Sequence, residues 1–146
     1  MSRVDEVRER IETEVSDLSG RLGNAAQFST VIETNQLPQV TPAGFVLPGG
    51  MRGGAAELVT GLFRQSISES VFVVVVVRVA GDALGAAAMD EAWPIVTAVR
   101  DAVVGWGPAG AMGVFTLASA ELVGSKDGAL IFQIDFTLQD QLRIAR

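Results

Sequence analysis

Apolar and charged positions alternate at helical spacing through the first 22 residues. Spacings of three and four place the apolar side chains in one stripe and the charged ones on the other faces, which predicts an amphipathic helix. Ser2 followed by Asp5 is typical of a capping box at its start, and Gly20 and Gly23 are expected to mark its end. The stripe consists of Val4, Val7, Ile11, Val15, Leu18 and Leu22.

The next part of the chain mixes helical and extended signals. Residues 24–35 are compatible with a second short helix, after which Pro38 and Pro42 force extended backbone on the residues before them. Residues 43–47 predict a short first strand. Residues 48–54 contain four glycines in seven positions. Because ordering glycine costs much conformational entropy, we expect this segment to be a mobile surface loop.

Residues 63–79 predict one long strand whose two halves differ. The first half alternates polar and apolar residues, whereas residues 71–77 are apolar on both faces, as in a central strand covered above and below. Glu69 and Arg78 are flanking charges that discourage aggregation. We therefore expect the polar first half to project beyond the core.

A second helical stripe lies between residues 89 and 106. Asp90 and Glu91 stand where negative charge suits the helix dipole, so we expect the helix to begin near Asp90 with Pro94 in its first turn. A start near Gly85 would instead put Pro94 inside the helix, where its ring clashes with the carbonyl group of Asp90. The stripe consists of Met89, Ala92, Val96, Val99, Val103 and Trp106.

The end of the chain predicts an antiparallel hairpin. Residues 130–138 alternate with the period of a half-buried strand, and residues 114–123 are the expected partner. Residues 124–128, with glycine at both ends, are the expected link. Together the elements predict a single α+β domain over residues 1–146: a mixed, largely antiparallel sheet of about four strands with two main helices packed on one face.

Composition removes most enzymatic chemistry from consideration. The chain has no His, no Cys and no Tyr, so disulfides and the usual zinc, iron–sulfur and haem ligand sets are excluded. A serine nucleophile would have only Lys126 as a base, in a turn that we expect to be solvated. We therefore expect no catalytic, cofactor-binding or metal-binding residue and no enzymatic activity.

One glycine motif matches the pattern of a dinucleotide-binding site. Residues 105–110 fit the pattern G-x-G-x-x-G. A dinucleotide site follows a strand and opens a helix, whereas this motif closes a helix and precedes a strand. We interpret it as a helix stop and a turn.

Charge and hydropathy indicate contacts with other chains rather than with nucleic acid or membrane. The formal charge of −6 and the scattered arginines argue against nucleic-acid wrapping. The apolar run 71–77 is far shorter than the ~20 residues of a membrane helix, and the charged N-terminus lacks the apolar stretch of a secretory signal, so a cytoplasmic protein is expected. The apolar fraction of 49%, beside 16 glycines and only 19% charged residues, predicts that other chains cover part of the surface.

Four segments resemble the tail terminator, or tail-completion, proteins of long-tailed bacteriophages and prophages. The resemblance is one of pattern and covers most of the chain. It implies a structural protein of the virion, assembled in the host cytoplasm, which forms a ring of six copies at the head–tail junction. Such a ring stops growth of the tail tube and offers a docking face to the head–tail connector, while an acidic lumen lets DNA pass without specific binding. The segments are residues 4–11, residues 36–43, the valine-rich strand running into 81–83, and residues 130–138.

The same resemblance suggests where contacts to neighbouring subunits or the tube lie: the polar half of the long strand, the 48–54 segment and the loop at Asp82. The 48–54 segment is either a plain flexible loop or one that orders on a partner. Asp135 gains interest only if a second chain covers its face, because a buried carboxylate needs a partner such as an arginine. The candidate interaction residues are Met51, Arg52, Arg64, Ser66, Ser68, Glu69, Asp82 and Asp135.

Two other functions remain open at this level. Another small neck or tail-tube component would share a similar layout. A dimeric, small-molecule-binding regulatory domain of the ferredoxin-like type would instead show a pocket and a twofold dimer. Trp93 and Trp106 fit core packing in each case, or interface anchoring.

Overall fold

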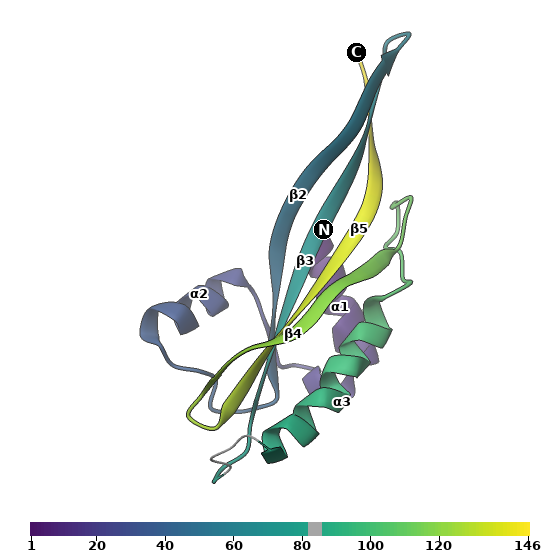
Figure 1. Ribbon diagram of the computed structural model, residues 1–146. Coiled ribbons are helices and arrows are strands. Elements are labelled where there is room, and N and C mark those ends of the chain that lie inside the picture. The colour runs from purple at the N-terminus through teal and green to yellow at the C-terminus, as the bar shows by residue number, and fades with distance from the viewer. Residues whose placement is uncertain (82–85) are drawn as a thin grey trace.

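A mixed five-stranded sheet with helices on both faces forms the framework of the computed structural model, which describes residues 1–81 and 86–146 (Figure 1). The strand order is β1-β2-β3-β5-β4; β1 is parallel to β2, and the other neighbours are antiparallel. The α+β prediction is confirmed, with one short strand more than expected. The elements are α1 (Arg3–Glu14), a 3₁₀ turn (Ser16–Leu18), β1 (Leu22–Gly23), α2 (Ala25–Thr34), β2 (Ala43–Val59), β3 (Leu62–Arg78), α3 (Ala86–Val103), β4 (Phe115–Lys126) and β5 (Ala129–Ala145).

Helix α1 begins as predicted and ends earlier. The Ser2 hydroxyl accepts a hydrogen bond from the Asp5 backbone N–H at 3.1 Å, and the Asp5 carboxylate accepts one from the Ser2 N–H at 3.3 Å, which confirms the capping box. The helix stops at Glu14 because Val15 is extended, so the prediction of a helix running to Gly20 was wrong. Val15 and Leu18 are nevertheless buried, because the 3₁₀ turn keeps the stripe against the core.

Helices α1 and α3 cover one face of the sheet, which we call the helix-side face. The main core lies between them and the sheet, and it takes alternate residues from each central strand. The sheet contributes Val71, Val73, Val75 and Val77 of β3 and Phe132, Ile134, Phe136 and Leu138 of β5. The prediction that two main helices pack on one face is therefore confirmed.

Helix α2 covers part of the other face, which we call the opposite face. Asn24 caps its start through a hydrogen bond from the Gln27 N–H at 2.9 Å, and Asn35 ends it in the left-handed conformation. Phe28 and Val31 of α2 pack against a smaller cluster that includes Phe45. The short helix predicted for residues 24–35 is confirmed.

The largest correction concerns residues 48–54, which are not a loop. They lie inside β2, where Met51 pairs with Glu69 and Arg52 with Ser68 of β3. The glycines mark two register shifts in this ladder instead, and Gly50 takes a φ of 91°, a conformation open mainly to glycine. The local glycine content predicted disorder, but the ladder with β3 imposes the strand.

Helix α3 differs from expectation at its start. It is already helical at Ala86, so the predicted start near Asp90 was wrong, and Pro94 lies inside the helix rather than in its first turn. The Pro94 carbonyl group accepts a hydrogen bond from the Thr97 hydroxyl at 3.0 Å. Burial of the apolar stripe outweighs the local cost of the proline, since Ala92, Val96 and Val99 are fully or almost fully buried.

Strands β4 and β5 form the predicted hairpin with a tighter turn. Pairing continues to Lys126 and Ala129, so only Asp127 and Gly128 connect the strands, both at positive φ. Strand β5 also runs past the predicted end at residue 138, and it pairs with β3 as far as Ala145. This extension makes the polar half of β3 part of a three-stranded structure.

Candidate functional site

Three strands extend together beyond the helices and form an arm (Figure 1). We define the arm as residues 49–59 of β2, 62–70 of β3 and 139–145 of β5. Strand β4 pairs with β5 only as far as Leu138, and β1 pairs with β2 only at Gly44 and Phe45. Among the described residues, the outer edges of the arm therefore have no neighbouring strand, and unpaired edges are places where further chains add.

The arm has an apolar face that continues the helix-side face of the sheet. Cross-strand partners share a face, and the register puts Leu58, Phe63 and Ile144 in one row. In the body, α1 and α3 cover this face; on the arm, it is open beyond the start of α1 (Figure 1). Met51 is 70% exposed and Leu58 is 64% exposed. The apolar residues of this face are Met51, Leu58, Phe63, Ile67, Leu142 and Ile144, and Gln65 and Asp140 lie among them.

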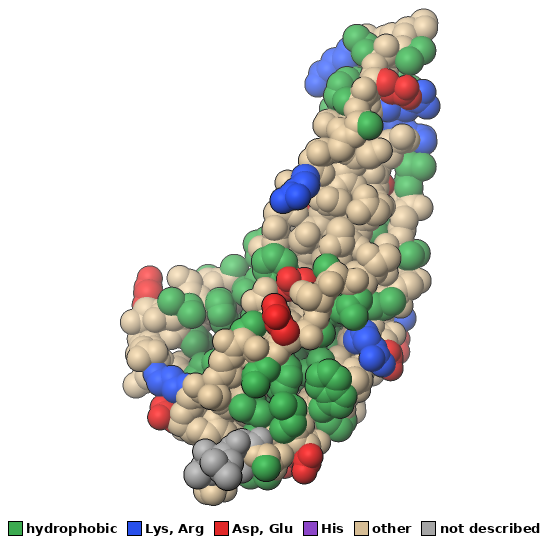
Figure 2. Space-filling model, in the orientation of Figure 1, with side chains coloured by type: hydrophobic (Ala, Val, Ile, Leu, Met, Phe, Trp, Pro, Cys, Tyr) green, Lys and Arg blue, Asp and Glu red, His purple; other side chains and the backbone are tan. Residues whose placement is uncertain are grey.

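The other side of the arm is polar and carries arginines, and we call it the arginine face. Arg64 pairs across the ladders with Glu57 on one side and Arg143 on the other. Glu57 forms an ion pair with Arg64 at 2.6 Å, and Arg143 donates a hydrogen bond to the side-chain oxygen of Gln141 at 2.7 Å. Figure 2 shows basic side chains spaced along the arm. The polar residues of this face are Arg52, Glu57, Arg64, Ser66, Ser68, Gln139, Gln141 and Arg143, and Val59 and Leu62 lie on the same side at the tip of the arm.

A charged cluster fastens α1 to the base of the arm. Arg3 forms ion pairs with Glu6 at 3.2 Å and with Asp140 of β5 at 3.3 Å. The Met112 N–H also donates to Asp140, at 3.3 Å. Burial raises the pKa of Glu69 above its ordinary value; nearby Arg3 opposes this shift, and the carboxylates of Asp140 and Glu6 add to it. The start of the arm is thus held at a defined angle to the helices.

Six of the eight candidate interaction residues lie on the arm. Met51 and Glu69 pair across β2 and β3 on the apolar side, whereas the other four lie on the arginine face. Asp82 is outside the described residues. Asp135 lies in the body, half-buried on the opposite face, where it accepts hydrogen bonds from Ser119 at 3.2 Å and Gln133 at 2.9 Å. Its partners are therefore within the chain.

The end of β5 contributes residues to the site that were not predicted from the sequence. Leu142 and Ile144 complete the apolar face, Arg143 completes the arginine face, and Asp140 holds Arg3. The alternation of residues 130–138 continues through residues 140–144, and it is the signal that identifies this extension.

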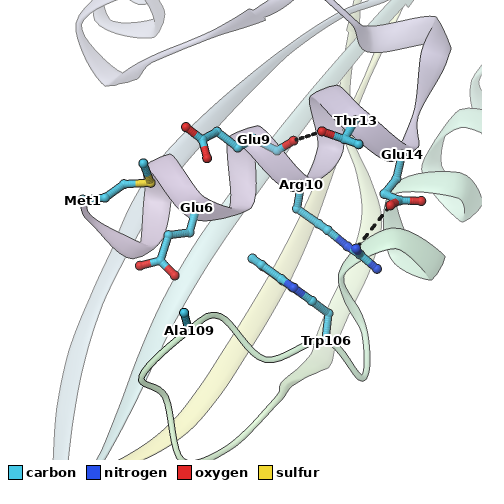
Figure 3. A pocket seen from close by; sticks show the side chains of 8 residues that line it. All are labelled: Met1, Glu6, Glu9, Arg10, Thr13, Glu14, Trp106 and Ala109. Carbon is cyan, nitrogen blue, oxygen red and sulfur yellow. Dashed lines mark hydrogen bonds and ion pairs between the residues drawn. The ribbon is translucent and has the colours of Figure 1, made fainter.

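A groove lies on the outer side of α1, against the loop that follows α3 (Figure 3). Its volume is about 590 Å³. Arg10 lies over the Trp106 ring at 5.5 Å and forms an ion pair with Glu14 at 3.2 Å. The lining residues are Met1, Glu6, Glu9, Arg10, Thr13, Glu14, Trp106 and Ala109. This groove is open and carries Glu6, Glu9, Arg10 and Glu14, unlike the enclosed pockets that bind most small molecules.

An exposed apolar area borders the free edge of β4. Leu117, Leu122 and Val123 are each at least 40% exposed, and Trp93 of α3, 50% exposed, packs on Phe132 at 6.2 Å between ring centroids. Figure 2 shows hydrophobic side chains gathered over β4 and α3. Contiguous apolar areas at a free strand edge are typical of protein contacts.

The described residues contain no cluster of potential metal ligands. No group of three or more His, Cys, Asp or Glu among them could hold a metal ion. Residues 105–110 follow α3 and precede β4, which agrees with a helix stop rather than a dinucleotide site. None of the described helices is long and apolar enough to span a membrane.

Comparison with known protein families identifies a family that covers the chain. The family described as phage tail terminator protein matches residues 2–146, essentially the whole chain. A search of curated proteins finds no significant match.

Proposed function

The chain belongs to the phage tail terminator family, whose members are structural proteins of the virion tail, and we propose that six copies form a ring that caps the tail tube. In this proposal the ring stops polymerisation of the tube, assembles in the host cytoplasm and offers a docking face to the head–tail connector.

The arm is the observation that supports assembly most strongly. Its strands are long, both of its edges lack a neighbouring strand among the residues that the structure describes, and its apolar face exposes Met51 and Leu58 to solvent. A monomer would gain nothing from such a surface and would risk aggregation. A protein built to meet other subunits uses the same surface for binding.

Ring closure needs two different patches on each copy, because a head-to-tail contact joins unlike surfaces. The chain offers several: the arm, the exposed apolar area around Leu122 and Trp93, and the groove beside α1. The number of six copies comes from the resemblance to tail terminators. The formal charge of −6 fits a lumen through which DNA passes without adhering.

The ligand-binding alternative receives no support from the groove, because the groove is open and carries the charged side chains of Glu6, Glu9, Arg10 and Glu14. A dimeric binding domain would need a more enclosed apolar cavity.

Tube growth in the presence of the protein tests the proposal. Tail-tube protein of the same phage is polymerised with and without the chain, and tube lengths and ends are measured in negative-stain images. We expect shorter tubes that carry a sixfold ring at one end. Tubes of unchanged length with bare ends would overturn the proposal, and a ligand-stabilised dimer would favour the binding domain.

A further inference from the structure

Cationic charge is concentrated on the arginine face of the arm. Arg64 and Arg143 are direct cross-strand neighbours, and like charges in this position repel one another. Glu57 pairs with Arg64 only, and Arg52 has no ion pair among the described residues. The face therefore has unbalanced positive charge, which an anionic partner would neutralise.

The complementary surface is the groove beside α1. The Glu9 side chain is exposed, and among the described residues it has no ion pair, whereas Glu6 and Glu14 are paired with Arg3 and Arg10 (Figure 3). Trp106 lies under Arg10 at 5.5 Å and stacks on Phe115 at 5.8 Å between ring centroids, so it forms a fixed apolar wall of the groove. The groove is thus acidic where the arm is basic.

One copy cannot make this contact with itself. Arg3 of α1 bonds to Asp140 on the helix-side face, and the arginine face lies on the other side of the same sheet. The two complementary surfaces therefore point to opposite sides of the molecule. This arrangement joins one copy to the next in a head-to-tail manner, which is the contact that a ring repeats.

We propose that the arginine face of the arm docks into the α1 groove of a neighbouring copy. The proposal rests on the ring assembly proposed above and names the two surfaces that form its repeated contact. Arg52 and Arg143 approach the Glu9 side of the neighbour's groove.

A second copy fits the arginine face better than duplex DNA does. Glu57 lies among the arginines, 2.6 Å from Arg64, and its carboxylate would repel phosphates. The remainder of the chain is acidic and would also oppose DNA. Binding of duplex DNA to this face is the competing outcome of the test.

Charge reversal on each surface tests the contact. The arm variant is Arg52→Glu with Arg143→Glu, and the groove variant is Glu9→Arg with Thr13→Arg. The groove positions are exposed, and the only described hydrogen bond there that involves either side chain is the one from the Thr13 hydroxyl to the Glu9 carbonyl. Arg100→Glu and Glu33→Arg, on exposed parts of α3 and α2, are single charge-reversal controls of the same sign as the arm and groove variants. Circular dichroism checks that every variant is folded.

Self-association is measured by light scattering on a sizing column over a concentration series, alone and on tube ends. We expect each variant alone to associate at least about tenfold more weakly than the wild type, and an equimolar mixture of the two to recover it. Self-association recovers in the mixture because copies of the two variants can alternate. Every arm then meets a groove of opposite charge. The controls should behave as the wild type does.

Two results would overturn the proposal and leave the ring itself standing. The first is a wild-type ring formed by the arm variant alone. The second is a mixture of arm and groove variants that stays as weak as its components. Loss of duplex DNA binding in the arm variant, with self-association intact, would assign the arginine face to DNA. If the wild type neither associates nor caps tubes, both this contact and the proposed function fail.

Discussion

Arg64 of β3 and Arg143 of β5 are paired directly across the antiparallel ladder of the arm, although both carry positive charge. Glu57 neutralises the first of them from the other side, at 2.6 Å. The fold therefore tolerates an unfavourable pair at an exposed position. Such a pair is understandable when the position is selected for contact with another molecule rather than for stability of the single chain.

Replacing Arg143 by glutamate should stabilise the isolated chain. The substitution places an opposite charge beside Arg64, and cross-strand ion pairs contribute about 0.2–1 kcal/mol. We expect a gain of this order in the free energy of unfolding, measured by urea denaturation at low protein concentration and low salt. The gain should shrink as salt screens the pair.

Gln139→Glu is the control for this substitution, because it adds negative charge to the same face opposite Ser68 rather than opposite an arginine. An equal gain in both variants would show that net charge matters, and not the Arg64–Arg143 pair.

The exposed apolar residues of the arm should be dispensable for folding and necessary for assembly. Met51→Ser with Leu58→Ser removes apolar surface that is 70% and 64% exposed. We expect a change of less than about 1 kcal/mol in the free energy of unfolding, because surface substitutions have small effects. Tube capping, counted in negative-stain images, should be largely lost.

Ile32→Ser with Val40→Ser is a closely matched control, since these side chains are 64% and 67% exposed but lie outside the arm. If this control loses capping as much as the arm variant does, general surface hydropathy explains the effect and the arm has no special role.

Glu69, which lies in the charged cluster at the base of the arm, should make the stability of the folded chain depend on pH. Burial raises its pKa, so the folded chain holds the proton more tightly than the unfolded chain does. The contribution of Glu69 to stability therefore falls as pH rises from its ordinary value of 4.5 towards the raised value, and it stays unfavourable above that.

Glu69→Gln should accordingly be more stable than the wild type at neutral pH, and the difference should vanish below pH 4.5. Thermal unfolding across a pH series measures this. A less stable Glu69→Gln at neutral pH would show that attraction to Arg3 outweighs the cost of burial.

Phe136 should be among the most sensitive core positions. It is fully buried on the helix-side face, and truncation to alanine leaves a cavity between the sheet and the helices. We expect a loss of about 3–5 kcal/mol in the free energy of unfolding. Leu117, its partner in β4, is 40% exposed, and Leu117→Ala should cost less than about 1 kcal/mol. Equal losses would mean that β4 is covered in solution.

Sequence patterns predicted the elements whose signals are local. The Ser2–Asp5 capping box, the valine-rich half of β3 and the alternation of β5 all follow from spacing within one segment. The strand at residues 48–54 does not, because its glycines favour no regular structure and only the ladder with β3 fixes it. Pro94 misled the prediction of α3 for the same reason: long-range packing overrides a local preference.

The candidate site divides in the same way. The polar half of β3 was recognisable from its serines and charges, and the structure places those residues on one arm. Their neighbours Arg143 and Asp140 were not recognisable, since they meet β3 only through the ladder between β3 and β5, which joins segments far apart in the sequence. Asp135 stood out by its position in a strand, yet its partners Ser119 and Gln133 lie within the chain.

The two register shifts in β2, after Pro48 and after Gly53, have opposite effects on the parity of that strand. The first moves odd-numbered residues to the helix-side face, and the second returns that face to even-numbered ones. Each shift holds one extra residue in β2 relative to β3, so removing one residue at a shift would make the ladder regular there and keep the inward and outward side chains of the outer part of β2 in place. The glycine-rich stretch is therefore the part of the arm in which a deletion of one residue should be absorbed.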